Sequence, residues 1–205
     1  MALEFLHRAD SANKGGAKHV ILFPGAWNPP TMAHVELARA ARERADEVIW
    51  VLPRIFPHKG FEGADFDARC RMIEALTREE PGFSAAVAGK GLYAEIAAEA
   101  VACLGQDTRI SFALGRDAAE RIAAWDYGKP GVFDRFVEQH GLLVAARDGE
   151  YQPAPAHQRF IDVLPMKGSW DEVSSTEIRR RISLGGNWRD LAPASIEAIV
   201  REIYK

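Results

Sequence analysis

His19-Val-Ile-Leu-Phe23 is an apolar run that leads into Pro24-Gly-Ala-Trp-Asn-Pro-Pro-Thr-Met-Ala-His34, and a helical pattern follows at once. The run predicts a buried strand, and the Gly and Pro residues after it predict a turn. If Thr31 starts the helix, His34 lies one turn later on the same face, beside backbone N–H groups that a helix start leaves without partners. Such a junction suits the binding of a phosphate group.

Apolar runs and helical patterns alternate along the rest of the chain. The predicted strands are Val20–Phe23, Val48–Leu52, Phe83–Val87, Ile110–Leu114 and Leu142–Ala145, and the predicted helices are Ala33–Arg44, Asp65–Arg78, Leu92–Leu104, Asp117–Ala124 and Val132–Gln139. Alternation of this kind favours a parallel sheet with helices on both faces. We expect an α/β fold of the Rossmann-like, doubly wound type, with a mainly parallel sheet of five to six strands.

The length of 205 residues predicts one ordinary domain. We place it at residues 19–205 and interpret residues 1–18 as an N-terminal lead without assigned function. The Pro-spaced stretch Gln152–Pro155 is expected to be a surface loop, because too little chain follows it to fold alone.

The composition is typical of a soluble globular protein, with 47% hydrophobic residues, 27% charged residues and a net charge of -3. It gives no support to a nucleic-acid partner. Cys70 and Cys103 stand alone, which favours neither a disulfide framework nor a zinc site and fits a reducing cytoplasm. No apolar run is long enough to predict a membrane span.

A second motif is Ser174-Ser-Thr-Glu-Ile-Arg179. Ser174 followed by Glu177 has the pattern of a capping box, which alone would explain a well-made helix start. Three consecutive hydroxyl residues exceed what a cap requires, and Arg179 lies one turn further, where its guanidinium can reach an anion at the helix end. Two helix starts of this kind would suit a polyphosphate.

Several other loops are expected at the edge of the sheet where the parallel strands end. They are Pro53–Gly63, Gly115-Arg-Asp117 and Arg147-Asp-Gly149. Each carries an open alternative. Lys59 is either solvated or a phosphate ligand, and Asp117 is either a helix cap or an acceptor for ribose hydroxyls. Trp125 is either core packing or a flat surface on which a ring stacks.

Together these residues resemble a nucleotidyltransferase superfamily, whose signature is a strand, a Gly-x-Phe-x-Pro loop, [His/Thr]-x-Gly-His at a helix start and a late Ser-Ser-Thr-x-Ile-Arg. Within it the chain is most similar to the nicotinate/nicotinamide mononucleotide adenylyltransferases. The matching segments, in the family's order, are Asn28-Pro-Pro, Leu52-Pro-x-x-x-Pro-His-Lys59, Arg69-x-Arg-Met-Ile73, Gly115-x-Asp117, Trp125 and Val173-Ser-Ser-Thr-x-Ile-Arg179. The likeness covers about Val20 to Arg181.

The resemblance implies a role for each matched residue. His34 would contact the ATP phosphates and stabilise charge at the α-phosphorus, with Thr31 in the place of the first motif His. The remaining implied ATP-binding residues are Gly25, Ala26, Trp27, Asn28, Gly115, Asp117, Arg147, Ser174, Ser175, Thr176 and Arg179, with Asp117 on the ribose and the last four on the β- and γ-phosphates. Lys59, Tyr93 and Trp125 would contact the acceptor, and Lys59 and Arg179 would share the catalytic work with His34.

Three departures from the family pattern concern the site. Ala33 replaces the motif Gly and adds a methyl group where ATP approaches the backbone. Trp27 replaces Phe, which is a mild change. The family's Tyr-Thr-x-x-Thr stretch has only a faint counterpart in Gly91-Leu-Tyr93.

The implied function is transfer of AMP from ATP to nicotinate or nicotinamide mononucleotide, which releases pyrophosphate and forms a dinucleotide in NAD biosynthesis. Mg²⁺ would arrive with ATP, and no metal site made by the protein alone is expected. Two alternatives stay open: a nucleotidyltransferase that uses another phosphorylated acceptor or CTP, and a non-catalytic nucleotide sensor with the same fold. The sequence leaves open whether the chain forms a homo-oligomer.

Overall fold

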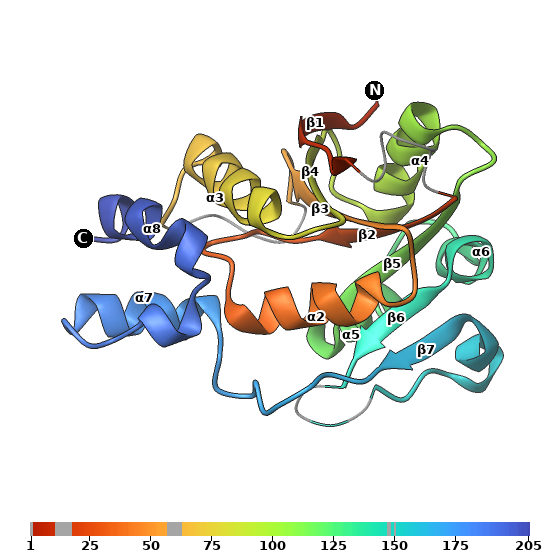
Figure 1. Cartoon of the computed structure of the whole chain (residues 1–205). Coiled ribbons are helices and arrows are strands. Elements are labelled where there is room, and N and C mark those ends of the chain that lie inside the picture. The colour runs from red at the N-terminus through yellow and green to blue at the C-terminus, as the bar shows by residue number, and fades with distance from the viewer. Residues whose placement is uncertain (1, 11–17, 57–62, 147–148, 150) are drawn as a thin grey trace.

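The computed structural model describes residues 2–10, 18–56, 63–146, 149 and 151–205 (Figure 1). In these residues the sheet has seven strands in the order β1-β4-β3-β2-β5-β6-β7. The strands are β1 (Glu4–His7), β2 (His19–Pro24), β3 (Glu47–Pro53), β4 (Phe83–Ala88), β5 (Arg109–Gly115), β6 (Leu142–Ala145) and β7 (Ile161–Leu164). Strands β2 to β7 pair in parallel, and β1 pairs antiparallel with β4 at one edge.

Helices cover both faces of this sheet (Figure 1). They are α2 (Met32–Arg42), α3 (Phe66–Glu79), α4 (Tyr93–Leu104), α5 (Arg116–Ala123), α6 (Val132–His140), α7 (Ser175–Ser183) and α8 (Glu197–Ile203), with short 3₁₀ turns η1 (Pro155–Phe160), η2 (Arg189–Leu191) and η3 (Ala194–Ile196). Helices α2, α3, α7 and α8 pack on one face, and α4, α5 and α6 pack on the other.

Alternation along the central strands supplies a separate core to each helix layer. In β2, Ile21 and Phe23 face the first layer, whereas Val20 and Leu22 face the second. All four side chains are buried, as expected for strands with helices on both faces. Burial on both faces explains why such strands read as continuous apolar runs in the sequence.

The predicted fold class is confirmed, and the five predicted strands and five predicted helices agree with the structure to within one or two residues at each end. The strand count is corrected from five or six to seven. Strand β1 lies inside the segment interpreted as a lead, and β7 follows the loop that contains Gln152–Pro155. Each of these two edge strands has four residues and includes polar side chains, so neither forms a clear apolar run.

The direction in which the sheet grows reverses at β2. From β2 the chain adds β3 and β4 on one side, and it then returns to add β5, β6 and β7 on the other. The carboxyl ends of β2 and β5 therefore flank the crevice in which open α/β sheets bind their ligands. Within the described parts of the chain, no helix has the length and apolar character needed to cross a membrane.

Candidate nucleotide-binding site

A cavity of about 270 Å³ opens at the carboxyl ends of β2 and β5. Its walls come from the loop after β2, the start of α2, the start of α5, the end of β6 and the first residue of α7. The predicted ATP-site residues that line it are Gly25, Ala26, Trp27, His34, Gly115, Asp117 and Ser175. Most of the ATP-binding prediction thus falls in one cavity at the expected edge of the sheet.

Thr31 and His34 form a reciprocal cap at the start of α2. The Thr31 N–H donates to His34 Nδ1 at 3.0 Å, and the His34 N–H donates to Thr31 Oγ1 at 3.3 Å. Because Nδ1 accepts from a backbone N–H, the proton of the neutral imidazole resides on Nε2. Thr31 itself is fully buried, at 0% exposure. Its hydroxyl therefore positions His34 instead of facing the cavity.

The Trp27 indole folds back into the core instead of lying open to a ligand. Its backbone has a φ of 51°, and its side chain is 3% exposed. Trp27 Nε1 donates to the Val51 carbonyl at 3.0 Å. A Cβ at Gly25 would lie 2.5 Å from this ring, so the fold needs glycine there. The indole packs edge to face against the imidazole of His34, with the two ring centroids 5.3 Å apart.

The start of α7 is attached to the loop after β2. Ser175 Oγ donates to the Pro29 carbonyl at 2.7 Å, and the Arg179 guanidinium donates to the Asn28 carbonyl. The early and late motifs, far apart in the sequence, therefore meet, as a shared polyphosphate site requires. Ser174 serves as the cap of α7, with Oγ accepting from the Glu177 N–H at 3.1 Å.

The capping box expected at α7 is only half formed. The carboxylate of Glu177 forms ion pairs with Arg180 and Arg181 at 2.7 and 2.8 Å. It does not accept the hydrogen bond from the Ser174 N–H that would complete the capping box. Hydrogen bonds from the two arginines lower the pKa of Glu177 to about 2. Thr176 is exposed, and Arg179 Nη2 approaches its hydroxyl at 3.4 Å.

A buried polar cluster supports this junction from behind. Asn28 Oδ1 accepts from the Ala64 N–H at 3.0 Å and from the hydroxyl of Tyr204. Arg69, 3% exposed, donates through Nε to the Ala64 carbonyl at 2.8 Å. Burial raises the pKa of Tyr204 to about 12 and lowers the pKa of Arg69. Tyr204 carries no motif signal, so analysis of the sequence missed it.

The first turn of α5 forms the opposite wall. Gly115 has an ordinary φ of -78°, and a Cβ there would meet no atom of the described residues within 4 Å. Asp117 is exposed, and Arg121 also lines the cavity one turn further along α5. The spacing of four residues puts Arg121 on the same helix face as Asp117, so this spacing is the sequence signal that could have indicated Arg121 as a site residue.

Two of the predicted acceptor residues, Tyr93 and Trp125, do not line this cavity. Tyr93 begins α4 and packs on Phe112 and Phe136, with ring centroids 5.3 and 6.3 Å away, and burial raises its pKa. Trp125 follows α5 and is partly exposed. Lys59 and Arg147 fall outside the described residues, so their predicted roles are not tested.

Among the described residues, no three His, Cys, Asp or Glu side chains gather where they could hold a metal ion. Asp117 is the acidic side chain that lines the cavity in the described part of the chain. A cavity with a single carboxylate among its described residues offers no cage of protein ligands for a metal, and would suit an Mg²⁺ only if a bound ligand and water supplied most of its coordination.

Comparisons with known proteins agree with this geometry. A model of the cytidylyltransferase-like family matches residues 22–181. A probable nicotinate-nucleotide adenylyltransferase of Salinibacter ruber is 30% identical, with 90% of this chain and 96% of the relative covered. A similar probable enzyme of Geotalea uraniireducens is 27% identical, with 87% and 93% covered.

A solved structure has a similar fold. It is the Plasmodium falciparum nicotinic acid mononucleotide adenylyltransferase complexed with NaAD, with a TM-score of 0.67, 16% identity, and 90% of this chain and 95% of that chain covered. Since the family model spans most of the sequence and one relative reaches 30% identity over nearly its whole length, the chain belongs to the cytidylyltransferase-like family and, within it, to the nicotinate-nucleotide adenylyltransferases.

Proposed function

We propose that this chain, a nucleotidyltransferase, transfers AMP from ATP to nicotinate mononucleotide, with release of pyrophosphate and formation of the dinucleotide used in NAD biosynthesis. One observation carries the proposal: His34 and Ser175, from motifs far apart in the sequence, line the same cavity at the switch point of the sheet. Curated relatives named for this reaction support the choice of substrate class.

The proposed reaction requires the protein to position its substrates and to stabilise negative charge. A phosphate oxygen of the mononucleotide attacks the α-phosphorus of ATP, the bond from that phosphorus to the bridging oxygen breaks, and pyrophosphate leaves. The attacking phosphate is already ionised, so no strong general base is needed. Catalysis then consists of in-line positioning and stabilisation of negative charge.

The geometry suits His34 to this task. With Nδ1 held by the Thr31 N–H, the ring presents Nε2–H as its donor. We assign this donor to the α-phosphate, where charge develops in the transition state. Thr31 is then a positioning residue, since its buried hydroxyl acts through the imidazole.

The two helix starts are assigned to the rest of ATP. The start of α7, with Ser174, Ser175, Thr176 and Arg179, takes the β- and γ-phosphates, because backbone N–H groups and a guanidinium favour anions there. The ribose lies over Gly115, with Asp117 accepting from its hydroxyls. An Mg²⁺ bound with ATP would neutralise phosphate charge and would be held mainly by the phosphates and water.

The acceptor is assigned to Trp125 and Lys59, whereas Tyr93, which packs against Phe112 and Phe136, is given no contact with it. This part of the proposal rests on the resemblance of the motifs. The two cysteines, both free, are consistent with a reducing compartment such as the cytoplasm.

The direct test is incubation of the chain with Mg-ATP and either nicotinate or nicotinamide mononucleotide, with the dinucleotide product measured by mass. We expect product and stoichiometric pyrophosphate, with nicotinate mononucleotide the faster acceptor. Pyrophosphate release with a different phosphorylated acceptor alone would replace the substrate assignment. Tight ATP binding without pyrophosphate release for any acceptor would show a nucleotide sensor instead.

A further inference from the structure

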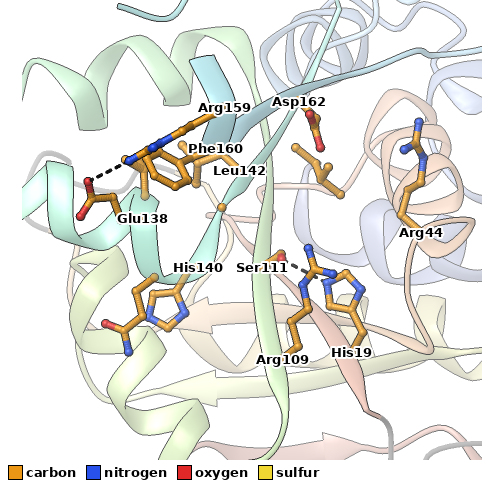
Figure 2. A pocket seen from close by; sticks show the side chains of 14 residues that line it. His19, Arg44, Arg109, Ser111, Glu138, His140, Leu142, Arg159, Phe160 and Asp162 are labelled. Carbon is orange, nitrogen blue, oxygen red and sulfur yellow. Dashed lines mark hydrogen bonds and ion pairs between the residues drawn. The ribbon is translucent and has the colours of Figure 1, made fainter. Parts of the chain in front are cut away.

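A second hollow of about 430 Å³ lies at the opposite edge of the sheet, where the parallel strands begin (Figure 2). His19, Arg109 and Leu142 are the first residues of β2, β5 and β6, and all three line it. None of the residues assigned to ATP or to the acceptor lines this hollow in the described structure. It is therefore separate from the nucleotide cavity, which lies at the other ends of the same strands.

The floor of the hollow offers hydrogen-bonding groups that carry no charge. His19 Nε2 lies 3.0 Å from Ser111 Oγ, as Figure 2 shows. Burial, and for His19 also the nearby Arg109, lowers the pKa of both His19 and His140. Both imidazoles are thus mainly neutral near pH 7. The positive charge of the hollow comes from its arginines.

Two of these arginines have no ion-pair partner within the described residues. Arg44 and Arg109 are exposed on the wall and approach no carboxylate to ion-pair distance there, whereas most other described arginines do. Arg159 differs, because it lies 3.9 Å from Glu138 and over the Phe160 ring at 4.5 Å. In a chain with a net charge of -3, two unpaired guanidiniums beside one hollow leave it a local excess of positive charge.

Two acidic side chains also line the hollow. Glu138 and Asp162 line the hollow on the side of α6 and β7. Carboxylates accept hydrogen bonds from hydroxyl groups, as guanidiniums donate to phosphate oxygens. The volume also falls within the range of about 300 to 1,000 Å³ that is typical of small-molecule sites.

We propose that this hollow binds a small phosphate monoester with a hydroxyl-bearing body, at a site distinct from the nucleotide cavity. The phosphate dianion is matched by Arg44 and Arg109, with the Ser111 hydroxyl and the His19 ring on the floor. The hydroxyl groups of the body are matched by Asp162 and Glu138.

The test uses ribose 5-phosphate as the probe and amide NMR of the isotope-labelled full chain as the readout. Shifts at Ser111 and Gly141 report on the hollow, whereas shifts at Gly25 and Gly115 report on the nucleotide cavity. We expect saturable shifts at the first pair. Ribose and inorganic phosphate, titrated separately, should bind more weakly, since each lacks half of the proposed contacts.

A double variant, Arg44→Ala with Arg109→Ala, should weaken binding at the hollow by about tenfold to a hundredfold. Both side chains are exposed, so the substitutions should leave the fold intact, which thermal unfolding checks. Arg135→Ala, an exposed arginine on α6 that does not line the hollow, is the matched control and should bind as the unmodified chain does.

Three results would overturn the proposal. They are the absence of shifts at Ser111 and Gly141 up to millimolar probe, equal affinity for inorganic phosphate, and unchanged affinity in the double variant. None of them bears on adenylyl transfer, so the two proposals fail independently.

Discussion

In the proposed reaction, the chemistry depends most on His34. Its Nδ1 is occupied by the backbone of Thr31, so the other ring nitrogen carries the donor proton. Replacement of His34 by Ala should lower kcat by about 10²- to 10³-fold, the cost of removing one donor to transition-state charge. Steady-state release of pyrophosphate measures this effect.

The matched control for that substitution is His157→Ala, which removes an imidazole paired with Asp134 on the surface, away from the cavity. It should turn over normally. If His34→Ala were as active as the control, His34 would have no part in the mechanism.

Gly115 lines the cavity, and a Cβ at this position would meet no described atom within 4 Å, so the absence of a side chain leaves room for a ligand. We expect Gly115→Ala to fold with unchanged thermal stability and to raise the KM for ATP, because the added methyl group enters the space assigned to the ribose. Gly186→Ala, where a Cβ meets only ordinary contacts, is the control and should leave the KM unchanged. Loss of stability in Gly115→Ala without a change in KM would mean that the glycine serves the fold.

On helix α7, Glu177 forms ion pairs with the side chains of Arg180 and Arg181. The pKa of this carboxyl, about 2, lies below the value of about 4.3 expected in the unfolded chain. A lowered pKa in the folded state means that the pairs with Arg180 and Arg181 stabilise the fold fully above the unfolded value, and that this contribution is lost as the pH falls toward 2.

The expected consequence is measured as the thermal midpoint of Glu177→Gln against the unmodified chain across pH. The variant should be slightly less stable at pH 5 to 7, because exposed pairs contribute little, and the difference should vanish near pH 2. A difference that stays constant over the whole range would show that the charge of Glu177 is irrelevant to α7.

The elements also show what local sequence determines. The strands buried on both faces are predictable to within one or two residues because nearly all of their positions are apolar. Every residue from Val48 to Leu52 is apolar, and Ser84 and Ser111 are the buried exceptions in β4 and β5. Strand β1 was missed because an edge strand is defined by its pairing with β4, as in Glu4 opposite Val87, and not by its own composition. Helix starts at Thr31 and Ser174 were predictable because capping uses specific side chains.

Tyr204, near the C-terminal end of the chain, supports the loop after β2 that contains Asn28. The Tyr204 hydroxyl donates to Asn28 Oδ1, and Arg179 and Ser175 contact the same loop through its carbonyl groups. The motifs indicate that the early and late segments meet, but no sequence pattern indicates the contact between Tyr204 and Asn28. That is why the motif residues of the site were predictable and Tyr204 was not.

Tyr204→Phe tests this support. Loss of one buried hydrogen bond should cost about 1 kcal/mol of unfolding free energy and should raise the KM for ATP, because the loop that contains Asn28 loses a partner. Tyr127→Phe is a matched control, since it removes a hydrogen bond to the Ile122 carbonyl at 2.9 Å. The control should lose similar stability while its KM for ATP stays unchanged. Equal effects of the two variants on KM would contradict a specific role for Tyr204.

The central claim is that the early and late motifs bind one triphosphate together. The most direct measurement is an amide NMR titration of the chain with Mg²⁺ and a non-hydrolysable ATP analogue, which follows Gly25 after β2, Gly115 before α5 and Ser175 at the start of α7. We predict that all three amides shift with a single dissociation constant. Shifts at Gly25 with none at Ser175, or different dissociation constants for the two motifs, would contradict the account.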